Sequence, residues 1–186
     1  MAELENSTKS TQLILGIEST AHTFGIALVD SSGTVLANER DAFTTEEGGM
    51  IPNQVAQHHV NVCGDVVKKA LACAGKTMKD VDIIAFSQSP GIGHCLRIGC
   101  VAARSLATLY EKPLIGVNHC IAHLEIGRLK TDATDPVLLY ASGANTQVIA
   151  YEGGKYRIFG ETLDNGVGNF LDGFGRALGL GFPGGP

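Results

Sequence analysis

Two histidines four residues apart, His119 and His123 in the segment VNHCIAHLEIGRL, have the types and the spacing to bind one metal ion. Four residues is about one turn of an α-helix, so both imidazoles would project from one face of a helix. A metal held there could polarise a carbonyl or phosphate oxygen as a Lewis acid. The pattern is not the HExxH motif of zinc proteases, because Cys120 stands where the general-base glutamate would be. The alternative is that the pair only packs at the start of a helix.

The elements that must position this pair can be predicted from the apolar pattern. Asn118 is a favourable N-cap for the helix that carries the histidines. Strands are predicted at 13–18, 24–30, 34–40, 81–87 and 112–117, and helices at 53–74, 94–110 and from 119 onward. The order βββαβαβα, with parallel strands joined through helices, indicates a layered α/β fold.

The pattern then restarts. The segments VLLYA, QVIAY and YRIFG repeat the three opening strands, with the polar turn SGANT in the place of the earlier turn STAHT. A helix is predicted at 169–180, with Asp164 as its cap. Two lobes of this kind are the plan of the actin, hexokinase and Hsp70-like ATPase superfold, whose small polar turns hold phosphate groups. We therefore expect a complete first lobe over residues 12–134 and a truncated βββα second lobe over 135–186.

Composition narrows the class of protein. A chain of 186 residues with a net charge of −5 is poorly suited to binding nucleic acid by itself, because such binding requires positive charges that neutralise phosphates. Any binding of RNA would therefore depend on basic partner proteins. No apolar stretch is long enough for a membrane span, and the polar start is unlike a signal peptide. We expect a protein without membrane contact, in the cytoplasm and also in the nucleus. The five cysteines lack a CxxC pair, which favours buried free thiols.

Five segments, in order, resemble the motifs of one family. They are GIESTAHTFGIALVD, AFSQSPGIG, VNHCIAHLEIGRL, LLYASGANTQVIAYEGGKYRIFGETLD and LGLGFPGGP. Together they are similar to the universal threonylcarbamoyl-adenosine tRNA modification family, formerly called O-sialoglycoprotein endopeptidases, whose archaeal and eukaryotic members are the catalytic subunit of the KEOPS (EKC) complex. The segments NHCIAHLEIGRL and QVIAY resemble eukaryotic members more than bacterial ones. A complete member is nearly twice as long, so the resemblance implies an N-terminal half.

The resemblance implies a metal site and an adenylate site. The metal, iron or zinc, would be held by His119, His123 and Tyr140, with a further aspartate from a DNG motif beyond residue 186. The substrate would be bound by Tyr140, Ala141, Ser142, Gly143, Ala144, Asp172 and Gly185.

The implied reaction moves threonylcarbamoyl from threonylcarbamoyl-AMP to the amine of an adenosine beside the tRNA anticodon. Because a mixed anhydride is already electrophilic, no covalent nucleophile is expected, only positioning and charge stabilisation. The implied partners are tRNA, bound through basic partner subunits, and the kinase and small subunits of a KEOPS-type complex. This chain alone is expected to be an inactive, incomplete copy.

Several residues leave alternatives open. Glu18 stands where superfold kinases often carry an aspartate, and it could orient a water molecule or a turn amide. Ala144 replaces a family glycine, and its methyl group could crowd a bound ligand. A competing hypothesis is a non-catalytic, half-length paralogue that binds or regulates a full-length transferase. A sugar or acetate kinase of the same superfold is disfavoured, because such a kinase does not need the histidine pair.

Overall fold

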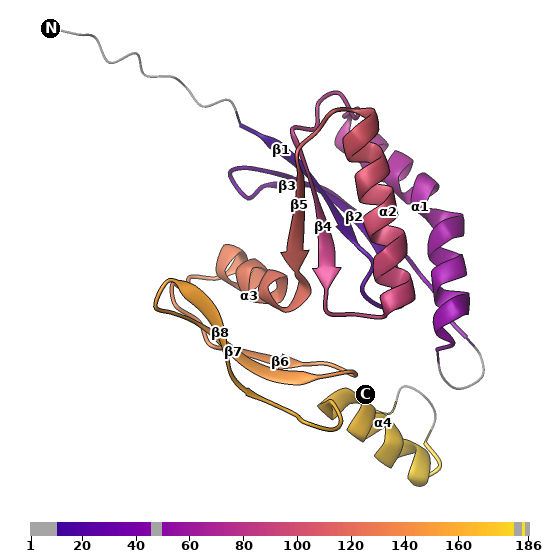
Figure 1. The fold of residues 1–186 in the computed structure, drawn as a ribbon, viewed down its shortest axis with the longest axis vertical. Helices are drawn as coiled ribbons and strands as arrows, with labels where there is room; N and C mark the ends of the chain where they lie inside the picture. Colours follow the sequence, from indigo (N-terminus) through magenta and orange to yellow (C-terminus); the bar gives the residue numbers. More distant parts are fainter. Residues whose placement is uncertain (1–10, 46–49, 181–183, 185–186) are drawn as a thin grey trace, which may run out of the picture.

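The computed structural model describes residues 11–45, 50–180 and 184 of the chain. Within these residues the chain forms two β-sheets (Figure 1). The first sheet contains β1 (Leu13–Glu18), β2 (Thr23–Asp30), β3 (Val35–Ala42), β4 (Ile83–Ser89) and β5 (Leu114–Asn118). The second contains β6 (Leu138–Ala141), β7 (Thr146–Glu152) and β8 (Lys155–Glu161). The helices are α1 (Pro52–Ala74), α2 (Gly93–Leu109), α3 (His119–Lys130) and α4 (Val167–Ala177).

The first sheet combines an antiparallel meander with a parallel half. Its strand order is β3-β2-β1-β4-β5, in which β1 pairs antiparallel with β2 and parallel with β4. Strand β5 pairs parallel with β4. Since parallel neighbours cannot be joined by a hairpin, α1 and α2 provide the crossovers. This confirms the predicted βββαβαβα order and the α/β class, and it brings the C-terminal ends of β1, β4 and β5 to one edge.

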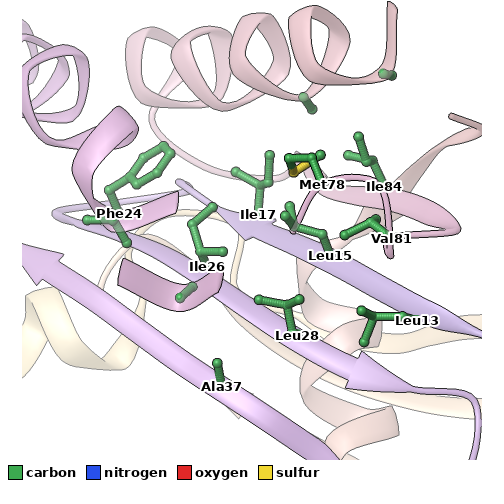
Figure 2. Packing of buried hydrophobic residues seen from close by; sticks show 14 residues of the cluster. Leu13, Leu15, Ile17, Phe24, Ile26, Leu28, Ala37, Met78, Val81 and Ile84 are labelled. Atoms are coloured by element: carbon green, nitrogen blue, oxygen red, sulfur yellow. The ribbon is translucent and has the colours of Figure 1, made fainter. Parts of the chain in front are cut away.

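The core lies between this sheet and the helices α1 and α2, which cover one of its faces (Figure 1). Alternate residues of β1 point into it, because side chains of a strand alternate between the two faces. Leu15, Phe24 and Leu28 are fully buried. Figure 2 shows how the residues of β1 and β2 meet Met78, Val81 and Ile84 in this layer. The first sheet is therefore a well-packed base for residues at its strand ends.

Helix α3 lies between the two sheets (Figure 1). It contacts β4 and β5 on one side and β6 on the other. A small cluster forms around it from Cys120, Leu124 and Ile149, with the half-buried Leu138, Tyr140 and Tyr156 packed against them. The second sheet is an antiparallel meander in the order β6-β7-β8, which repeats the layout of β1-β2-β3 as the sequence predicts. The boundary between two lobes at residues 134 and 135 stays a prediction.

The end of the described chain differs from the expectation in detail. Helix α4 begins at Val167 and ends at Ala177, instead of running from 169 to 180. Gly179 has a φ of 75°, a left-handed conformation in which glycine commonly ends helices. The expected cap by Asp164 is wrong, because Gly166 is the N-cap residue and has no side chain. Asp164 instead accepts a hydrogen bond from the backbone of Asn165, at 2.7 Å.

Two further expectations can be compared with the structure. Among the described residues, none of the helices has the length and apolar character needed to cross a bilayer. All five cysteines are free, as predicted, but only Cys95 and Cys120 are buried, and Cys73 is exposed.

Candidate functional site

The histidine pair lies where β5 passes directly into α3. The side chain of Asn118, the last residue of β5, accepts hydrogen bonds from the N–H groups of Cys120 and Ile121, at 2.9 and 3.2 Å. This confirms the predicted N-cap, which fixes where the helix starts. His119 is therefore the first helical residue and His123 lies one turn later, on the same face.

The two imidazoles have a geometry that suits one shared ion. Their Nε2 atoms are 3.2 Å apart, and the ring planes are nearly perpendicular. Two nitrogens that each lie about 2.0–2.1 Å from one metal are separated by roughly 3.0–3.4 Å. The Tyr140 ring, from β6, lies beside both, with centroid distances of 6.0 Å to His119 and 5.3 Å to His123. The structure thus brings together the three side chains that the resemblance implies as ligands.

The ionisation of His123 and of Tyr140 is set mainly by burial. Burial and the nearby His119 lower the pKa of His123, which favours the neutral imidazole that metals bind. Burial raises the pKa of Tyr140, although a hydrogen bond with Ser142 opposes this. Tyr140 is therefore a phenol in the free chain, and a metal would have to displace its proton on binding.

A carboxylate that the sequence did not connect to the pair stands behind His119. Glu18 Oε2 accepts a hydrogen bond from His119 Nδ1 at 3.1 Å and another from the Ser87 hydroxyl. Its Oε1 accepts from the backbone N–H of Thr20 at 2.6 Å and from the Thr20 hydroxyl. Burial alone would raise the pKa of Glu18, but hydrogen bonds from His119, Ser87 and Thr20 outweigh it and lower the pKa to about 2.

The expected role of Glu18 as an acceptor for a turn amide is confirmed by its bond with Thr20. Its contact with His119 was missed, since 101 positions separate the two residues. The order of the strands in the sheet is the feature that could have indicated this contact. Glu18, Ser87 and His119 lie at or near the C-terminal ends of β1, β4 and β5, and such ends commonly form sites in parallel sheets.

The predicted adenylate turn lies between β6 and β7. The Ser142 hydroxyl donates to the carbonyl oxygen of Asn145 at 2.8 Å and accepts from its N–H at 3.2 Å. The start of α4 packs closely against this turn, because a Cβ added at Gly166 or Gly168 would lie within 3 Å of turn backbone atoms. Gly143 is half-buried, whereas Ala141 and Ala144 are exposed.

The remaining predicted site residues are less closely connected. Asp172, on α4, accepts a hydrogen bond from the N–H of Gly184 at 2.8 Å, rather than one from the turn. Gly185 lies outside the described residues. The part of the chain that the structure describes has no group of three or more His, Cys, Asp or Glu residues placed to hold a metal. Two imidazoles and a phenol therefore make a partial ligand set.

A pocket of about 330 Å³ opens between the start of α3 and the second sheet. Its lining residues include Ser89, Asn118, Cys120, Gln147 and Arg157. Its size suits a small ligand. It does not include Tyr140 or the turn at 142–145, so it differs from the adenylate site that the resemblance implies.

Comparison of three-dimensional folds defines the class of protein. The fold is similar to that of YeaZ from Pseudomonas aeruginosa, with a TM-score of 0.57 and 19% identity, covering 81% of this chain and 66% of that one. It is also similar to the ethanolamine utilization protein EutJ from Carboxydothermus hydrogenoformans, with a TM-score of 0.54 and 15% identity, covering 90% of this chain and 57% of that one. The chain has the α/β fold of the actin, hexokinase and Hsp70-like superfold.

Sequence comparison defines the family. Residues 34–186 match the family described as tRNA N6-adenosine threonylcarbamoyltransferase, and the chain belongs to it. It is 58% identical over 174 residues to the enzyme of that name from Thermococcus kodakarensis, covering 94% of this chain and 53% of the relative. It is 50% identical over 173 residues to the one from Thermofilum pendens, covering 93% and 52%. The chain thus spans about half the length of these archaeal relatives, and the eukaryotic character that its segments suggest stays a prediction.

Proposed function

We propose that this chain supplies the metal-binding and adenylate-binding part of a tRNA N6-adenosine threonylcarbamoyltransferase. The enzyme would move threonylcarbamoyl from threonylcarbamoyl-AMP to the adenosine beside the anticodon. The observation that carries the proposal is the pair of facing Nε2 atoms, 3.2 Å apart, with the Tyr140 ring beside them. Membership of the family supports the reaction. Because the chain spans about half of its relatives, the activity of the whole enzyme is extended to it here as a proposal.

His119, His123 and Tyr140 would hold one divalent metal, and this donor set suits iron or zinc. When bound, the metal would supply Lewis-acid polarisation of a carbamoyl or phosphate oxygen. Asn118 caps the helix that begins at His119, and Glu18 accepts a hydrogen bond from the His119 ring. The position and orientation of His119 would therefore be set before a metal binds. The resemblance implies a further aspartate ligand beyond residue 186.

The other residues would act by positioning. The turn from Ser142 to Ala144 would place backbone N–H groups against the adenylate phosphate, as such turns do in other phosphate sites. Ala141, Asp172 and Gly185 would complete the substrate contacts. No covalent nucleophile is required, because the mixed anhydride reacts directly once the amine of adenosine is held in line. The acidic chain would meet tRNA through basic subunits of a KEOPS-type complex, in the cytoplasm and nucleus.

Elemental analysis of the purified chain tests the metal role. We expect iron or zinc below one equivalent, because three protein donors leave the site open and weak. The double substitution His119→Ala with His123→Ala should remove the metal. His94→Ala is the matched control, since His94 is an exposed histidine on α2. Equal metal content in the double variant and the parent would contradict the proposal.

A second candidate function is a non-catalytic paralogue that binds or regulates a full-length transferase. The observation that favours it is the exposure of apolar side chains on the second sheet, including Leu139, Ile158 and Phe159. A transfer assay with labelled threonylcarbamoyl separates the two. A catalytic part would restore transfer when mixed with the complementary half of a relative, whereas a regulator would only change the rate of a complete enzyme.

A further inference from the structure

Glu18 is held from three elements at the point where it meets the histidine pair. Thr20, in the β1–β2 turn, contributes its backbone N–H and its hydroxyl, and Ser87 of β4 contributes a second hydroxyl. The fourth donor is His119 at the start of α3, with Nδ1 3.1 Å from Oε2. Both carboxylate oxygens are therefore engaged, and the side chain cannot rotate without breaking several contacts.

We propose that Glu18 is a positioning residue that fixes the tautomer of His119 for metal binding, an inference that rests on the proposed metal role of the pair. A carboxylate is an acceptor only, so its contact with Nδ1 requires a proton on that nitrogen. A neutral imidazole carries only one N–H, so Nε2 is left with its lone pair. In the metal-free chain that lone pair accepts a hydrogen bond from Nε2 of His123 at 3.2 Å, and a shared ion would take the place of this proton.

The same contact has consequences for orientation and affinity. Glu18 orients the ring of His119, and the Asn118 cap fixes the start of the helix from which that ring projects. A carboxylate that accepts from a ligand imidazole also makes that imidazole a stronger donor to the metal. Loss of such a partner typically weakens metal binding by about 10–100-fold. Among the residues that the structure describes, His123 has a hydrogen bond with His119 and none with a carboxylate, so the effect of Glu18 is exerted through His119.

The competing explanation is that Glu18 only anchors the β1–β2 turn through Thr20. Glu18→Gln separates the two roles, because the amide preserves the size of the side chain but introduces a donor that can face Nδ1. Glu39→Gln is the matched control. Glu39 also lies on the first sheet, in β3, where its carboxylate pairs with Lys69 at 2.7 Å, away from the histidines.

Two measurements on the full chain test the proposal. In a Co²⁺ titration against a competing chelator, we expect Glu18→Gln to lose about 10–100-fold in affinity and Glu39→Gln to match the parent. In nitrogen-resolved NMR of the metal-free parent, under mildly alkaline conditions, His119 should carry its proton on Nδ1. Ser87→Ala, which removes one donor to Glu18, should cause a smaller loss, and it remains informative if Glu18→Gln fails to fold.

The outcomes are distinct. Unchanged Co²⁺ affinity in folded Glu18→Gln, or a proton on Nε2 of His119 in the parent, would overturn the positioning role while leaving the metal site intact. If the parent does not bind Co²⁺ at all, the proposed metal role fails instead. The NMR measurement then still decides whether Glu18 sets the tautomer, because it needs no metal.

Discussion

At the scale of single residues, His59 shows how a buried imidazole is tied to the edge of the site. Its side chain is fully buried on α1, and Nε2 lies 2.9 Å from the carbonyl oxygen of Ala21 in the β1–β2 turn. The ring packs edge-on against Phe24 at a centroid distance of 5.5 Å. Burial lowers the pKa of His59 below its ordinary value of 6.5, so the imidazole is neutral in the folded chain.

This predicts a stability that depends on pH. Between the lowered folded pKa and 6.5, the unfolded chain binds a proton at His59 that the folded chain does not. The free energy of unfolding is therefore expected to fall as the pH is lowered below 6.5. Thermal melts between neutral and acidic pH would measure this. His59→Gln should reduce the acid sensitivity, because the amide does not titrate, while His94→Gln on the exposed side of α2 should retain it. The same acid loss in both variants would contradict the assignment.

Only some of the residues of the candidate site could be predicted from the sequence. Spacing places His119 and His123 on one helical face, and the structure adds the facing Nε2 atoms. The proximity of Tyr140 could be inferred only through the family resemblance, because it comes from another sheet. Glu18 and Ser87 could not be assigned to His119 by spacing at all. Their contact depends on β4 inserting beside β1, which requires knowing the strand order.

At the scale of elements, the β4–α2 loop supports the β1–β2 turn. The N–H of Ile92 donates to the carbonyl oxygen of Thr20 at 2.7 Å. A Cβ at Gly91 would lie 2.6 Å from the same oxygen, a distance at which the backbone must move. Gly93, two residues later, has open space where a Cβ would stand. Substitution of Gly91 therefore tests the close contact with Thr20, and substitution of Gly93 is a control for adding a methyl group nearby without such a contact.

We expect Gly91→Ala to destabilise the chain by about 1–3 kcal/mol, the usual cost of overpacking. It should also weaken metal binding, because Thr20 holds Glu18 and Glu18 holds His119. Gly93→Ala should be neutral or stabilising, since alanine reduces the freedom of the unfolded chain. Denaturant titrations and Co²⁺ affinity measure the two effects. Equal stability of the two variants would show that the loop does not support the turn as described.

The β6–β7 turn makes a similar prediction for ligand binding. The Ser142 hydroxyl closes the turn through Asn145, and α4 packs against it. Ser142→Phe should therefore lower affinity for a stable threonylcarbamoyl-adenylate analogue by about tenfold or more, equivalent to about 1.4 kcal/mol. Ser32→Phe is the control, because Ser32 lies in the β2–β3 turn. Similar losses for both in a calorimetric titration would argue against an adenylate site at this turn.

The boundaries of helices and strands could be predicted where the sequence signals are strong. The predictions failed where tertiary contacts determine the boundary. The start of α1 at Pro52 and the N-cap Asn118 match the sequence signals. Helix α4 differs because its start packs against the Ser142 turn, where only glycines at 166 and 168 fit. That contact makes Gly166 the N-cap residue and Val167 the first helical residue, so Asp164 lies outside the helix. Tertiary packing, invisible in the local sequence, thus overrides the capping preference of aspartate.

At the scale of the whole molecule, the two sheets differ in how well they are covered. The first sheet has a continuous core under α1 and α2. Among the described residues, Ile149 is the one apolar side chain of the second sheet that is buried, with 3% exposed. On its outer side Leu139 and Phe159 are 66% and 63% exposed, and Phe170 of α4 is 61% exposed. Exposed large apolar side chains on one part of a protein, where they form a patch, mark a surface that another protein segment normally covers.

The whole-molecule prediction is that this chain alone is not a stable, active monomer. Each Å² of apolar surface withheld from burial forgoes about 25 cal/mol, so several hundred Å² forgo on the order of 10 kcal/mol, comparable with the stability of a domain. The edge strands β6 and β8 also offer free backbone groups for pairing with other chains. We expect oligomers or aggregates in light scattering after size-exclusion chromatography, and no transfer of labelled threonylcarbamoyl to tRNA by the chain unaided.

Two sets of substitutions test whether the exposed apolar side chains cause the association. Phe159→Ser with Phe170→Ser should shift the population toward monomer without loss of core stability. Leu15→Ala in the first core should cost about 2–5 kcal/mol and should not reduce association. A monodisperse parent monomer with one cooperative thermal transition would show that the second sheet is already sufficiently covered.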